Sequence, residues 1–132
     1  MYLVDTNVWL ERLLDQSNSV DVGNFLERYS SDQLVIADFS FHSIGVILNR
    51  FHKETLFLEF AKDILVRGGV AVGSLSAQEM ENVVAAIKKY KLDFDDAYLY
   101  VVAKKFDAII VSFDKDFDKT PRGRKKPADL IL

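Results

Sequence analysis

Aspartates are grouped at three places in the sequence where a strand or a helix is expected to end or begin. Asp5 directly follows the apolar run Tyr2–Val4, and Asp114 comes shortly after the run Ala108–Val111. A third group, Asp-Phe-Asp-Asp at 93–96, opens an apolar helical stretch. Carboxylates that converge in space bind hard divalent cations, and such cations activate water for hydrolysis. These aspartates are therefore the candidates for chemistry.

Each group also has an explanation that involves no chemistry. Asp5 fits the N-cap of a following helix, because Asp is favoured there. Asp93 fits the N-cap of the helix that this group opens, and Asp95 and Asp96 would then interact favourably with the helix dipole in its first turn. Asp114 fits an ordinary charged turn. One group alone decides little, so the chemical interpretation depends on whether the groups meet.

The elements that would position these acids alternate between strand and helix. Short continuous apolar runs are typical of strands buried on both faces of a parallel sheet. They lie at Tyr2–Val4, Leu34–Ala37, Val70–Val72, Ala108–Val111 and Leu130–Leu132. Between them, apolar residues recur with helical period, which predicts a mostly parallel sheet covered by helices. Sites in such sheets form at the carboxyl ends of strands, where Asp5 and Asp114 fall.

Length and composition fit one intracellular domain. The 132 residues are enough for a single core, so we expect one domain over residues 1–132. The chain has no Cys, which excludes disulfide scaffolds and thiolate metal sites. The N-terminus has no basic region, and no apolar run approaches the roughly 20 residues of a membrane span. We therefore expect a cytoplasmic protein without a membrane anchor.

The net charge of −3 bears on any nucleic-acid partner. A protein that holds nucleic acid by neutralising phosphates alone is usually basic. This chain would need a local basic patch or a bound cation instead. The segment Arg122-Gly-Arg-Lys-Lys126 is a candidate for phosphate contacts, although a charge run in a loop is usually only solvated.

Three motifs, in this order and at this spacing, resemble those of the PIN domain family and especially its VapC-like toxins. They are Asp5-Thr-Asn-Val, Asp96-Ala and Ser112-Phe-Asp114-Lys-Asp-Phe, and the resemblance covers nearly the whole chain. It implies a three-layer α/β/α fold with a mostly parallel five-stranded sheet of order 3-2-1-4-5. The first and fourth strands are then neighbours, which brings Asp5 and Asp114 to one edge.

The same resemblance implies a function. Asp5, Asp96 and Asp114 would be the catalytic residues and would hold Mg²⁺ or Mn²⁺, and carboxylates without thiolates suit these hard ions. The protein would be a metal-dependent endoribonuclease and the toxin of a type II toxin–antitoxin pair. It would act on RNA, form a homodimer and be restrained by an antitoxin.

The chain departs from the family at Ser43, where the pattern has a Glu on the helix after the second strand. The alternative function is therefore a weakened or inactive PIN-like domain that binds RNA or a protein partner. Asp38 could compensate, but it fits an N-cap better, and His42 points away from Ser43 on a helix. The preferred spare ligands are Asp95 and Asp116, beside the matched acids.

Two further features have more ordinary interpretations. Trp9, Leu10 and Leu13 lie at helical spacing, which favours core packing over a partner surface. A phospho-acceptor receiver domain also places Asp at strand ends, but it needs an acidic pair near the first strand and a strand-end Lys. The run ending at Asp5 offers one acid, and no expected strand ends in Lys.

Overall fold

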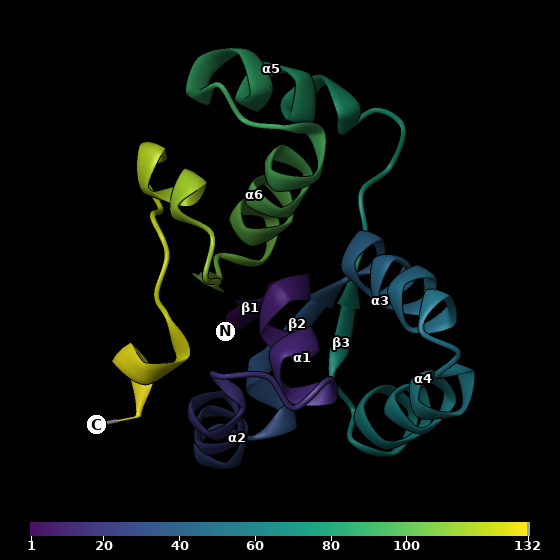
Figure 1. Ribbon diagram of the computed structural model, residues 1–132. Coiled ribbons are helices and arrows are strands. Elements are labelled where there is room, and N and C mark those ends of the chain that lie inside the picture. The colour runs from purple at the N-terminus through teal and green to yellow at the C-terminus, as the bar shows by residue number, and fades with distance from the viewer. Residues whose placement is uncertain (132) are drawn as a thin grey trace.

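The computed structural model describes residues 1–131 and centres on a sheet of four parallel strands (Figure 1). The strands are β1 (Tyr2–Val4), β2 (Leu34–Ala37), β3 (Ala71–Gly73) and β4 (Ile109–Val111), in the order β3-β2-β1-β4. β1 pairs with β2 on one side and with β4 on the other. The expected order of the first four strands is confirmed.

The expected fifth strand at Leu130–Leu132 is not where the sequence suggested. A single parallel bridge joins Val111 to Lys125, whose N–H donates to the carbonyl of Ile110 over 2.8 Å. The chain then enters a 3₁₀ helix at Pro127–Leu130, and residue 132 lies outside the described part of the chain. Proline has no N–H to donate to a ladder, so the pairing stops at the bridge.

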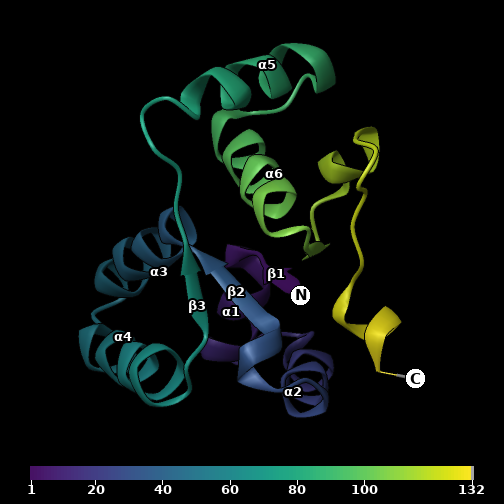
Figure 2. The same cartoon turned by 180° about the vertical axis from the view of Figure 1, so that it is seen from behind.

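Helices cover both faces of the sheet, which gives the expected three layers (Figures 1 and 2). They are α1 (Thr6–Leu13), α2 (Ser19–Arg28), α3 (Asp38–Arg50), α4 (Glu54–Phe60), α5 (Met80–Tyr90) and α6 (Phe94–Phe106), with a π-helical segment at Ala61–Arg67. Neighbouring strand residues face opposite layers. Leu3 packs with α5 and α6, whereas Val4 packs with α1 to α4.

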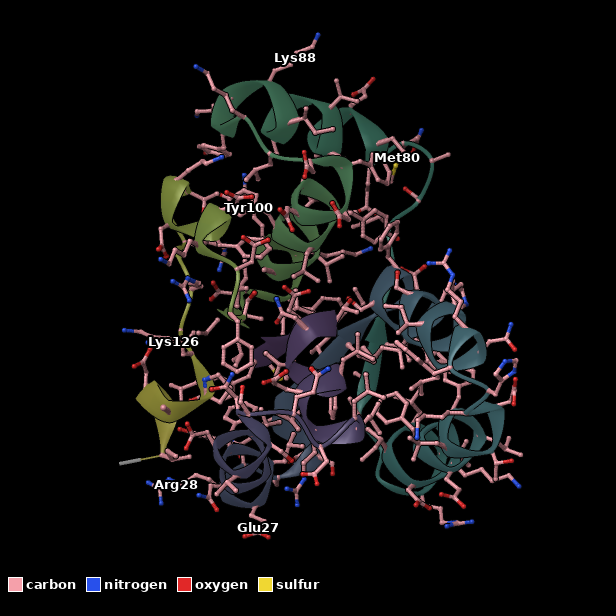
Figure 3. All side chains as sticks on the ribbon, viewed as in Figure 1. Glu27, Arg28, Met80, Lys88, Tyr100 and Lys126 are labelled. Atoms are coloured by element: carbon pink, nitrogen blue, oxygen red, sulfur yellow. The ribbon has the colours of Figure 1, made fainter. Side chains whose placement is uncertain are left out.

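The helix α6 is the most deeply buried element. Its residues 96–103 are all buried, as the continuous apolar stretch predicted. Trp9 of α1 is 2% exposed and packs edge-on against Phe60 at 5.3 Å between ring centroids, so its core role is confirmed. Charged side chains such as Glu27 and Lys88 project from the periphery (Figure 3). Within residues 1–131, no helix has the length and apolar character of a membrane span.

Candidate metal centre

Asp5 occupies the junction between β1 and α1. Its N–H donates to the carbonyl of Val111 over 2.9 Å, which continues the β1–β4 ladder by one residue. Its carboxylate caps α1 by accepting from the N–H of Thr6 at 2.7 Å through Oδ1. The other oxygen, Oδ2, accepts from the hydroxyl of Ser112 at 2.7 Å. Asp5 therefore caps a helix and also presents a carboxylate at the carboxyl end of the sheet.

The buried side chain of Ser112 connects the motifs that follow β1 and β4 through hydrogen bonds. Besides donating to Asp5, its Oγ accepts from the N–H of Asp114 at 2.9 Å and from the side-chain amide of Asn7 at 3.4 Å. The carbonyl oxygen of Asn7 in turn accepts from the N–H of Phe113 at 3.3 Å. The sequence motifs contain Ser112 and Asn7 but assign neither a role. In the structure, their hydrogen bonds position the segments that carry Asp5 and Asp114.

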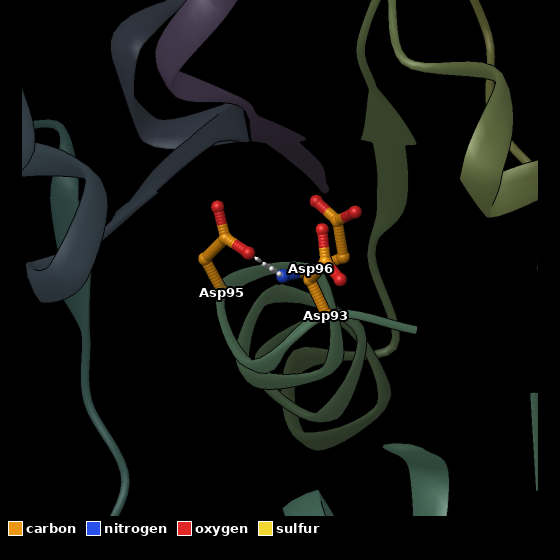
Figure 4. Close-up of side chains that lie close together, drawn as sticks. All are labelled: Asp93, Asp95 and Asp96. Atoms are coloured by element: carbon orange, nitrogen blue, oxygen red, sulfur yellow. Dashed lines mark hydrogen bonds between the residues drawn. The ribbon is translucent and has the colours of Figure 1, made fainter. Parts of the chain in front are cut away.

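The first turn of α6 brings three carboxylates together. Oxygens of Asp93, Asp95 and Asp96 lie within 4.8 Å of one another (Figure 4). Oδ1 of Asp95 accepts from the N–H of Asp96 at 3.1 Å. Asp93 holds the N-cap position, but its side chain makes no capping hydrogen bond and its carboxylate joins the group.

A second group of acids joins α6 to the segment after β4. Oxygens of Asp96, Asp114 and Asp116 also lie within 4.8 Å of one another. Oδ1 of Asp114 accepts from the N–H of Asp116 at 2.9 Å, which closes the turn that follows β4. Asp116 is also 3.4 Å from the ammonium of Lys119. Asp96 is common to both groups and is 9% exposed.

The predicted acids converge on one cavity of about 320 Å³. Asp5, Asp96 and Asp114 all line it, and Asp95 contributes a fourth carboxylate. The remaining lining residues are Thr6, Asn7, Leu10, Phe39, Ser40, Ser43, Ile47, Tyr98 and Leu99. The cavity therefore has an acidic end and an apolar wall.

The electrostatics of the cavity favour a cation. Burial raises the pKa of Asp5 to about 6, against the opposing hydrogen bonds from Ser112 and Thr6. The pKa of Asp96 is raised to about 7, mainly by burial and in addition by the nearby charges of Asp114 and Asp95. Crowded carboxylates of this kind are destabilised when ionised and stabilised by a divalent cation. An all-oxygen donor set without thiolates fits Mg²⁺ or Mn²⁺.

The position where the family pattern has Glu also faces this cavity. Ser43 of α3 lines it and is half-buried. Asp38 does not line it. Its Oδ1 accepts from the hydroxyl of Tyr98 at 2.8 Å and from the N–H of Phe39 at 2.7 Å. Asp38 is the first residue of α3, one position after the N-cap. His42 is exposed and lies outside the cavity.

The basic segment after β4 is partly used inside the protein. Arg122 pairs with Asp107 at 3.2 Å, and Arg124 pairs with Asp118 at 3.2 Å. Arg124 also donates to the carbonyl of Ser112 at 3.3 Å, which fastens this segment beside the acids. These contacts give both arginines a structural role.

Comparison with known proteins gives a family and a fold. The model of the family described as PIN domain matches residues 2–123. No curated protein is a significant match. A toxin–antitoxin complex from Klebsiella pneumoniae contains a chain with 23% identity and a TM-score of 0.76, over 96% of this chain and 98% of that one.

Two further solved structures have the same fold. The Mycobacterium tuberculosis toxin VapC20, described as cleaving the sarcin–ricin loop, has 18% identity and a TM-score of 0.75, over 89% of this chain and 93% of that one. A protein of Pyrobaculum aerophilum has 18% identity and a TM-score of 0.66, over 98% of this chain and 91% of that one. At these identities the likeness concerns the fold.

Proposed function

This chain belongs to the PIN domain family, and we propose that it is a metal-dependent endoribonuclease that hydrolyses phosphodiester bonds of RNA. One observation carries the proposal. Asp5, Asp96 and Asp114, which come from three separate elements, line a single cavity at the carboxyl ends of the parallel strands. Burial raises the pKa values of Asp5 and Asp96, the neighbouring carboxylates act in the same direction, and a divalent cation would relieve this cost of ionisation.

In this proposal each residue of the site has a distinct task. Asp5, Asp96 and Asp114 would hold Mg²⁺ or Mn²⁺. When bound, such a cation polarises the scissile phosphodiester and lowers the pKa of the attacking water. Ser112 fixes the orientation of Asp5 through its 2.7 Å hydrogen bond. The side chains of Leu10 and Ile47 supply part of the apolar wall of the cavity.

We further propose that the chain is the toxin of a type II toxin–antitoxin pair, with an antitoxin and a second copy of itself as partners. The similar Klebsiella pneumoniae chain comes from a toxin–antitoxin complex, and VapC20 is named as a toxin. Co-expression with a small protein encoded next to this chain tests the pairing. Co-purification of the two and loss of RNA cleavage in the complex are the expected results.

Ser43 supports a second candidate, a PIN-like domain that binds RNA or protein without cutting. A hydroxyl replaces a carboxylate of the family pattern, so the cation would lose one charged ligand. Asp95, which lines the same cavity, is placed to supply a fourth carboxylate. Its presence is the reason to prefer the enzyme.

A cleavage assay separates the two candidates. Labelled RNA is incubated with the protein in Mg²⁺ or Mn²⁺, and products are resolved by size. We expect cleavage by the natural chain, none in chelator, and none with Asp114→Asn. Asp15→Asn is the matched control, because Asp15 is exposed and its positive φ of 49° also suits Asn. RNA binding and Mn²⁺ binding without cleavage would favour the second candidate.

A further inference from the structure

Three aromatic side chains form a continuous surface beside the acids. The ring centroids are 5.6 Å apart for Phe39 and Tyr98, 6.0 Å for Phe39 and Phe94, and 6.1 Å for Phe94 and Tyr98. Phe39 and Tyr98 line the same cavity as Asp96. Phe94 precedes the acids Asp95 and Asp96 on the first turn of α6. Phe94 does not itself line the cavity, but its ring packs against the two rings that do, so the three rings border the acidic site.

The two phenylalanines are exposed, although the cluster as a whole is rigidly supported. Phe39 is 37% exposed and Phe94 is 48% exposed, whereas Tyr98 beneath them is 7% exposed. The hydroxyl of Tyr98 donates to Asp38 at 2.8 Å and accepts from the N–H of Leu75 at 3.1 Å. These bonds tie the start of α3 to α6, so the exposed rings rest on a fixed base.

The site is acidic, so RNA binding there would need a favourable contact that does not depend on positive side chains. The chain carries a net charge of −3, and the cavity is lined by carboxylates. Arg122 and Arg124 are engaged with Asp107 and Asp118. Stacking of a nucleobase on an aromatic ring is independent of charge and holds single-stranded nucleic acid on many proteins.

We propose that Phe39 and Phe94 are a stacking surface for an unpaired nucleobase beside the phosphate that the acidic cluster receives. This inference rests on the proposed nuclease function and assigns the residues that would hold a base of its substrate. A base inside a duplex is already stacked on its neighbours and cannot present a face to a side chain. Binding through these rings therefore requires an unpaired base, and a duplex of the same sequence should bind poorly.

Binding and stacking are measured separately from cleavage. An end-labelled short single-stranded RNA containing 2-aminopurine is titrated with protein in Ca²⁺, and its intactness is checked by electrophoresis. Phe39→Leu and Phe94→Leu keep an apolar side chain and remove the ring. Each is expected to weaken binding about tenfold and to reduce quenching of 2-aminopurine fluorescence. Phe39→Trp keeps a stacking face and should retain both signals.

Phe51→Leu is the matched control, because Phe51 is 58% exposed at the opposite end of α3 and should not affect RNA binding. Thermal unfolding verifies that each variant is folded. Unchanged affinity and quenching in both Leu variants would overturn the proposal. So would a change of oligomeric mass by light scattering with normal RNA binding, since the rings would then contact a second copy of the chain.

The outcomes also separate this inference from the proposed function. Ring-dependent binding without cleavage in Mn²⁺ would support the stacking surface and overturn the nuclease. Cleavage that persists at full affinity in the Leu variants would support the nuclease and overturn the stacking surface. Absence of RNA binding by the natural chain would overturn both.

Discussion

The hydroxyl of Ser112 donates a 2.7 Å hydrogen bond to Oδ2 of Asp5 and so joins the end of β4 to the end of β1. The same Oγ accepts from the N–H of Asp114 at 2.9 Å. One buried hydroxyl thus sets the position of two candidate metal ligands that are separated by most of the chain. The hydrogen bond from Ser112 lowers the pKa of Asp5 and so partly offsets burial, which raises that pKa to about 6.

Ser112→Ala should therefore destabilise the protein and raise the pKa of Asp5 further. A hydrogen bond to a charged group contributes about 1.5–3 kcal/mol, so we expect a loss of about 2 kcal/mol in the free energy of unfolding. Urea unfolding in chelator measures the loss, and calorimetry with Mn²⁺ should show weaker binding. Ser112→Thr keeps the hydroxyl and should restore much of both. Equal Mn²⁺ affinity in the Ala variant would show that Ser112 does not position the ligands.

The metal-free protein should become less stable as the pH rises from about 4 to about 7. The pKa of Asp96 is raised to about 7, mainly by burial. At a pH between about 4 and about 7, the folded protein therefore keeps this proton, whereas the unfolded chain has lost it. Ionisation of the folded form then costs free energy, and Asp5 adds a smaller effect in the same direction. We expect a decrease of about 2–4 kcal/mol between about pH 4 and about pH 7.

Denaturant titrations in chelator across this range measure the pH effect. Asp96→Asn removes the ionisable group, so it should flatten the dependence and stabilise the metal-free protein at about pH 8. Asp15→Asn is the control for loss of one negative charge at an exposed position. Stability that rises with pH in the natural chain would mean that the carboxylates are compensated by contacts within the protein.

The strands and the buried helix follow from continuous apolar runs, and these were predictable from the sequence. The end of the sheet was not, because Pro127 stops the pairing after a single bridge at Lys125. Asp93 holds the expected N-cap position, but its grouping with Asp95 and Asp96 was not predicted. It has extended backbone angles, with φ −69° and ψ 164°, so the helical period does not set the direction of its side chain.

The predicted convergence of Asp5, Asp96 and Asp114 depended on ordered motifs and on the geometry of parallel sheets. Other contacts between residues far apart in the sequence involve no recognisable motif, so they could not be predicted. Phe39 and Phe94 meet through the packing of α3 against the start of α6. The bond from Tyr98 to Asp38 links the same two helices. Nothing in either local sequence indicates these pairs.

A divalent cation should raise the melting temperature. A ligand that binds only the folded state adds RT ln(1 + [L]/Kd), about 2.7 kcal/mol at a hundredfold excess over Kd. For a domain of this size, that corresponds to roughly 10 °C. Thermal unfolding in Mn²⁺ and in chelator measures the shift. Asp96→Asn should reduce it strongly, whereas Asp15→Asn should keep it. The absence of a shift with either Mg²⁺ or Mn²⁺ would contradict a native-state metal site.

Ser43→Glu should strengthen the candidate metal centre. Ser43 lines the same cavity as Asp5, Asp96 and Asp114, so a longer acidic side chain starts beside the carboxylates. Glu is a better helix former than Ser, so α3 should accept the change. An added charge raises the repulsion among the acids, and the metal-free variant should therefore be less stable above about pH 6. In Mn²⁺ the variant should instead be more stable than the natural chain. Calorimetry should show tighter Mn²⁺ binding, and RNA cleavage should be faster. Ser43→Gln has nearly the same shape without the charge and should show neither gain. If a folded Ser43→Glu variant binds Mn²⁺ no better than the natural chain, another acid already fills this role, and Asp95 and Asp116 are the residues to replace next.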